Sequence, residues 1–157
     1  LQNLINYYIF SGQKQTAIEY LDQAIAREPN VAQYHHIKGN LLEDAKEYDA
    51  AMAEFDKACE LDPKLADAVA GKGRVYYNQA VKMNEDAAYI NDKKQYNKAL
   101  AEMKAMFKKS LPFFEQAHAL EPDNTDYMRT LKALYYRFID EPGMQDKYDA
   151  IVNELGY

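Results

Sequence analysis

Several residue types that define other classes of protein are scarce in this sequence of 157 residues. It contains one cysteine, Cys59, which excludes an intrachain disulfide and a Cys-x-x-Cys metal site. Only six glycines and five prolines are present, a composition that favours helix throughout. No run of about 18 apolar residues occurs, so the sequence predicts no membrane-spanning helix.

Basic residues are outnumbered as well. The chain has 19 lysines and arginines against 25 aspartates and glutamates, a formal net charge of −6. This balance disfavours general affinity for nucleic acid. Lysines do gather between positions 93 and 109, but they are interspersed with acids and spread around a helix. We therefore expect no nucleic-acid partner.

The sequence also lacks the motifs of catalytic and metal sites. His35 and His36 are adjacent, so on a helix they point about 100° apart and cannot hold one metal ion together. Cys59 falls at a half-buried repeat position and is predicted to be a small core residue. No glycine-rich phosphate loop, G-x-S-x-G or H-E-x-x-H sequence is present. We predict no catalytic residue, no metal and no cofactor.

What the sequence does contain is a set of landmark residues that recur at a fixed interval of about 34 residues. Four of them, Ala17, Leu21, Ala24 and Pro29, reappear one interval later as Ala51, Phe55, Ala58 and Pro63, and Gly39 reappears as Gly73. Three then recur after the same interval lengthened by an insertion of 25, as Phe114, Ala117 and Pro122. Self-similarity at such a period is typical of repeat architectures.

Apolar residues at helical spacing predict a pair of helices for each repeat. The predicted helices cover 1–11, 15–27, 31–45, 47–61, 65–88, 94–120, 123–138 and 144–155. The insertion extends the third pair into a long helical hairpin that turns at 89–92. Pro112 lies inside the long second helix, where it should bend the helix or remove a hydrogen bond.

With these residues in view, the chain resembles the tetratricopeptide repeat family. The family places a small residue in the middle of its first helix, small and large residues along the second, and a proline at the end. Three departures are lysines: Lys38 and Lys72 stand where the family has a bulky residue, and Lys132 stands where it has the glycine. The resemblance implies an all-α, right-handed α-solenoid with about four helix-turn-helix units in a single domain. The units span about 1–30, 31–63, 64–122 with the insertion, and 123–157.

The resemblance also implies a non-catalytic scaffold that binds a protein or peptide in a concave groove lined by the first helices. The residues expected to line this groove are Asn6, His36, Asn40, Arg74, Tyr77, Asn78, Arg129, Tyr136 and Arg137. The alternative is a structural or self-assembling module that uses the extended hairpin or an exposed terminal helix.

The hairpin itself leaves two interpretations open. It either packs on itself and shields one edge, or presents Met83, Met103 and Met106 as an adaptable surface for a partner or a second copy. The compartment is open too. No targeting peptide is visible, so the chain is expected in the cytoplasm, or in the periplasm if a signal peptide has been removed.

Overall fold

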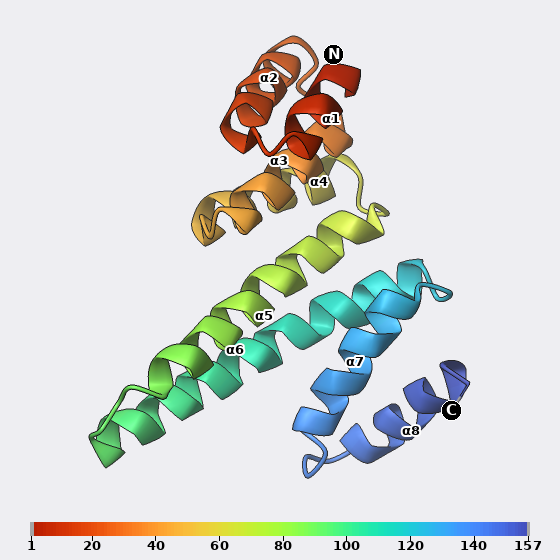
Figure 1. The fold of residues 1–157 in the computed structure, drawn as a ribbon. Helices are drawn as coiled ribbons and strands as arrows, with labels where there is room; N and C mark the ends of the chain where they lie inside the picture. The colour runs from red at the N-terminus through yellow and green to blue at the C-terminus, as the bar shows by residue number, and fades with distance from the viewer. Residues whose placement is uncertain (1, 157) are drawn as a thin grey trace. The chain divides into compact units, whose positions relative to one another are not determined.

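A computed structural model describes residues 2–156, which form eight helices and no strand (Figure 1). The predicted first and last units include residues 1 and 157, which lie outside this described part. The helices are α1 Gln2–Phe10, α2 Lys14–Arg27, α3 Ala32–Asp44, α4 Tyr48–Leu61, α5 Ala66–Ala87, α6 Lys93–Leu120, α7 Thr125–Arg137 and α8 Met144–Glu154. The predicted all-α fold and the predicted helices are confirmed.

The chain divides into two compact units, one extending to Gly71 and the other beginning at Lys72. The prediction of a single domain stays a prediction. In the first unit α3 and α4 form a helix pair with a left-handed residue, Lys46 (φ 62°), in the turn between them.

Local capping explains where the later helices begin. The Asn124 side chain accepts hydrogen bonds from the backbone N–H groups of Asp126 and Tyr127 at 3.1 and 3.4 Å, which starts α7. Asp92 accepts from the backbone N–H of Gln95 at 2.8 Å and starts α6. Such side-chain caps satisfy N–H groups that the first turn of a helix leaves without a partner.

The core of the first unit depends on one aromatic ring. Phe55 on α4 is fully buried, and it lies against glycines on two other helices. A Cβ added at Gly39 on α3 would come within 2.7 Å of the ring, and one added at Gly71 within 2.6 Å. No real side chain tolerates such distances, so both helices approach the ring only because these positions are glycine.

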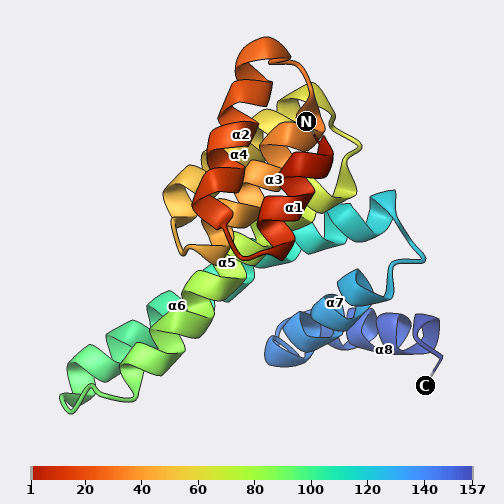
Figure 2. The ribbon, with the colours of Figure 1, turned by 45° about the horizontal axis from the view of Figure 1, so that its top comes forward.

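The second unit repeats this contact and carries the long hairpin. A Cβ at Gly73 on α5 would lie 2.9 Å from the Phe114 ring on α6, and Phe114 is only 4% exposed. Further along, Tyr76 stacks on Phe113 with ring centroids 5.9 Å apart. The two helices run side by side in both views of the chain (Figures 1 and 2).

The hairpin forms where the insertion predicted it. α5 ends at Ala87 and α6 begins at Lys93, so the predicted turn at 89–92 is confirmed. α6 continues as one helix through Pro112, whose ring is exposed to solvent. The three methionines of the predicted contact surface, Met83, Met103 and Met106, are each half-buried.

Lys38 shows how the first unit accommodates a charge at a bulky repeat position. Its Nζ lies 2.7 Å from Asp22 Oδ1 on α2 and 2.8 Å from Glu54 Oε1 on α4. Burial lowers the pKa of Lys38, but hydrogen bonds from the ammonium to Asp22 and Glu54 outweigh that effect, so its pKa is raised. His35 Nδ1 contacts the other oxygen of Glu54 at 2.7 Å. A partly buried charge is stable only when it is paired. Because the two carboxylates that pair with Lys38 lie on α2 and α4, its ammonium links α3 to both neighbouring helices.

The Phe55 contact predicts a specific stability defect. Gly39→Ala should lower the free energy of unfolding by about 1–3 kcal/mol, because the new methyl group overpacks the ring by more than the helix gains in propensity. Urea denaturation followed by circular dichroism measures this change. In a Phe55→Leu background the same substitution should cost clearly less, and an equal cost in both backgrounds would contradict the steric explanation.

The Lys38 contacts predict a second defect. Lys38→Met should destabilise the chain by about 1–3 kcal/mol, because Glu54 and Asp22 then lose a charged hydrogen-bond donor. Lys57→Met is the matched control: Lys57 pairs with Glu60 at 3.2 Å, but both side chains are exposed, so the effect should stay under about 1 kcal/mol. Equal denaturation midpoints for the two variants would refute the role given to Lys38.

Candidate functional site

In the first unit the predicted groove residues contact one another. His36 is 7% exposed, and its Nε2 lies 3.1 Å from the Asn40 amide nitrogen. Its Nδ1 lies 3.4 Å from the Gln33 amide nitrogen, so an amide group lies beside each ring nitrogen. Asn40 is half-buried, whereas Asn6 on α1 is exposed. His36 therefore offers little surface to a partner and instead orients Asn40.

In the second unit a buried phenylalanine brings together two predicted residues from different helices. The Arg137 guanidinium carbon on α7 lies 3.9 Å from the centroid of the Phe107 ring on α6. Tyr77 on α5 meets the same ring edge-on, with centroids 5.0 Å apart. Phe107 is 2% exposed, Tyr77 half-buried and Arg137 exposed. We call these three residues the Phe107 cluster.

Two more predicted residues lie on α5 beside this cluster. Arg74 and Asn78 flank Tyr77 at helical spacing, so the three share one face of α5. Both are half-buried and already interact with neighbouring groups. The face therefore combines the Tyr77 ring with side chains that are held in place rather than extended into solvent.

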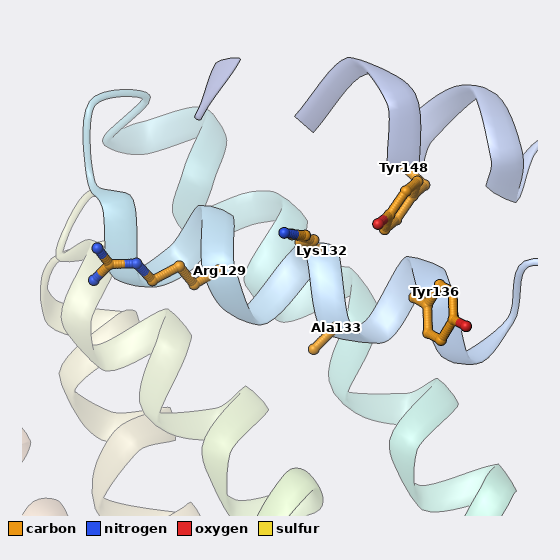
Figure 3. A pocket seen from close by; sticks show the side chains of 5 residues that line it. All are labelled: Arg129, Lys132, Ala133, Tyr136 and Tyr148. Carbon is orange, nitrogen blue, oxygen red and sulfur yellow. The ribbon is translucent and has the colours of Figure 1, made fainter. Parts of the chain in front are cut away.

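A pocket of about 260 Å³ lies between the last two helices (Figure 3). Its lining residues are Arg129, Lys132, Ala133 and Tyr136 on α7, and Tyr148 on α8. We call this site the end pocket. The spacing of the first four places them on one face of α7. The Tyr136 and Tyr148 rings lie 5.8 Å apart, and Tyr136 is 66% exposed.

Glu115 on α6 positions the helices that form this pocket. Its Oε1 accepts a hydrogen bond from the Tyr135 hydroxyl on α7 at 3.0 Å and from Lys147 Nζ on α8 at 2.6 Å. Burial and the nearby Glu115 carboxylate raise the pKa of Tyr135 well above its ordinary value, so the hydroxyl stays a donor. His118 Nε2 on α6 adds a 3.0 Å contact with Glu154 on α8.

Sequence reasoning named Arg129 and Tyr136 but missed Lys132, Tyr148 and Phe107. The repeat pattern could have pointed to two of them. Lys132 takes the place of the repeat glycine, and Tyr148 follows Phe114 by one repeat interval. For Phe107 the sequence alone gives no signal, because it does not show which aromatic ring on one helix contacts a third helix.

Within residues 2–156, no three histidine, cysteine or acidic side chains are grouped so that they could hold a metal ion. The predicted core residue Cys59 is half-buried. Among the helices described, none has the length and apolarity needed to cross a membrane.

Comparison with known proteins finds a family-model match in the first part of the chain and similar folds among solved structures. The family model described as tetratricopeptide repeat matches residues 3–66. Two crystal structures of MamA are similar in fold, with TM-scores of 0.69 and 0.65 at 17% and 18% identity. They cover 97% and 98% of this chain, which spans 74% and 66% of theirs.

A monomeric mutant of IFIT1 gives a TM-score of 0.71 at 16% identity, over 95% of this chain and 32% of its own. No curated protein matches the sequence significantly. At these identities the structural matches establish the fold, and proteins of this family are typically non-catalytic scaffolds that bind other proteins or peptides.

Proposed function

We propose that this chain is a tetratricopeptide-repeat protein and a non-catalytic scaffold that binds a protein or peptide partner along the first helices of its repeats. These helices are α1, α3, α5 and α7. In this proposal they line one groove of a single domain. Asn6 and Asn40 belong to that groove in the first unit, and Arg74, Tyr77, Asn78, Arg129, Tyr136 and Arg137 in the second.

The Phe107 cluster is the observation that carries this proposal. Arg137 lies over the Phe107 ring, so the ring restricts the guanidinium while the side chain stays exposed to solvent. A guanidinium held in this way can bind a carboxylate through two parallel hydrogen bonds. Tyr77 adds rigid apolar area with a polar hydroxyl beside it. Arginine and tyrosine are also the residue types that most often dominate binding energy at protein interfaces.

The proposal predicts that binding depends on the exposed members of the Phe107 cluster. Partners captured by the purified chain from its native source are identified, and their dissociation constants are measured for wild type and variants. Arg137→Ala and Tyr77→Ala should each weaken binding by about tenfold or more, because each removes an anchor of the contact.

Tyr89→Ala is the matched control for the tyrosine variant. Tyr89 lies at the tip of the hairpin, between α5 and α6, and is 85% exposed, so its loss should leave affinity unchanged. Circular dichroism checks that each variant keeps its helix content. A partner that binds both cluster variants as tightly as wild type would refute the groove assignment.

A second candidate function, self-assembly, has support from α1. Leu4, Tyr7 and Phe10 are 38%, 60% and 88% exposed on this helix, an unusual concentration of large apolar side chains at a surface. Self-assembly through α1 predicts a molar mass that rises with concentration in static light scattering. Phe10→Glu should abolish that rise, whereas a constant monomer mass would exclude this candidate.

A further inference from the structure

The part of the long hairpin next to its turn has almost no core of its own. We call residues 81–106 the outer hairpin; they form the end of α5, the turn, and the first half of α6 (Figure 1). Across this range Ala87 is the one buried side chain. By comparison, α4 in the first unit buries Ala51, Phe55 and Ala58. Two helices that pair only with each other leave apolar surface in water, and stable folds cover such surface with a further layer.

The outer hairpin nevertheless carries apolar side chains at helical spacing. Tyr96, Leu100 and Met103 follow one another along one face of α6. On α5, Val81 lies one turn beyond Tyr77 and shares its face. Val81 and Tyr96 are 37% and 39% exposed, while Leu100 and Met103 are half-buried. These residues form an apolar strip that is open to solvent on one side, as is typical of a surface that another protein chain covers.

The charges of the outer hairpin are divided between its two helices. Most of them are already engaged: Lys82 pairs with Asp86, Lys98 with Glu102 and Lys104 with Glu141, and Asp92 caps the first turn of α6. The others are Glu85 on α5 and Lys93 and Lys94 on α6, which are exposed and have no ion-pair partner among residues 2–156. A carboxylate on one helix and two ammonium groups on the other therefore remain unpaired, all close to the turn.

We propose that the outer hairpin pairs with the outer hairpin of a second copy of this chain. The two hairpins lie side by side with their turns at the same end, and a two-fold axis runs along them. Each α5 then lies against the α6 of the other copy, so Glu85 of one copy meets Lys93 and Lys94 of the other, and the contacts are repeated across the axis. The two apolar strips together form the core of a four-helix arrangement.

The distribution of charge favours a second copy over other occupants. A two-fold interface must be complementary to itself, which requires both signs of charge on the same surface, and Glu85 and the two lysines meet this requirement. An anionic lipid surface would attract Lys93 and Lys94 but repel Glu85. An acidic or a basic protein would likewise match one of the two helices only. The inference does not rest on peptide binding by the Phe107 cluster, and it adds a second copy to the partners of the proposed scaffold.

Sedimentation equilibrium of the intact chain at several concentrations tests this proposal. The wild type should show a reversible monomer–dimer equilibrium. Glu85→Lys makes the three unpaired charges positive, and the double variant Lys93→Glu/Lys94→Glu makes them negative. Each variant alone should weaken the dimer by about tenfold or more, because like charges then meet across the axis. An equimolar mixture of the two variants should dimerise again, because every contact in the mixed dimer joins opposite charges.

Two control variants make the result specific to the hairpin. Lys57→Glu reverses an exposed charge on α4, away from the outer hairpin, and should leave the dimerisation constant unchanged. Phe10→Glu should also leave it unchanged, so association through α1 and association through the hairpin can be told apart. All the substituted side chains of the hairpin are exposed, and circular dichroism checks that each variant keeps its helix content.

Three results would overturn the proposal. One is a wild-type chain that stays monomeric at every concentration, including one that sediments with vesicles containing phosphatidylserine, which would assign the hairpin to a lipid surface. Another is a dimer that the charge variants do not weaken or that Phe10→Glu abolishes. The third is a pair of monomeric charge variants whose mixture fails to associate.

Discussion

The close approach of helices to one buried aromatic ring is the constraint on which the repeats depend. Gly39 and Gly71 both lie against Phe55, and neither position has room for a methyl group. Because interiors are packed almost as densely as organic crystals, the ring and the two missing side chains form one fitted unit. The same contact recurs with the repeat: Gly39 lies against Phe55, and Gly73 lies against Phe114. The repeat period in the sequence therefore reflects this packing requirement.

The contacts of the lysines that depart from the repeat pattern explain how the fold accommodates their charges. Lys38 is stabilised by carboxylates on both adjacent helices. Lys72 places its ammonium 5.1 Å from the centre of the Phe113 ring, a cation–π contact. Lys132 is different in kind, because it takes the place of a glycine and lines the pocket between α7 and α8. One residue type thus has three structural roles at related positions.

The helices and turns could be predicted from the sequence because their causes are local. Apolar spacing, the Asn124 cap and the length of the insertion each act within a few turns of helix. The site was less predictable. Which ring Arg137 covers, and that His36 is buried against Asn40, depend on contacts between side chains that the repeat pattern does not specify. The repeat register could have pointed to Tyr148, but only the structure shows that a space opens beside it.

The long hairpin has a practical consequence. Its tip, from Ala88 to Asp92, joins two helices that pair with each other, and four of its five residues are exposed. Segments of this kind tolerate added sequence well, because their backbone takes little part in the core. A fluorescent domain or an affinity handle placed there would extend a natural projection. It would report on the molecule while leaving both the Phe107 cluster and the end pocket uncovered.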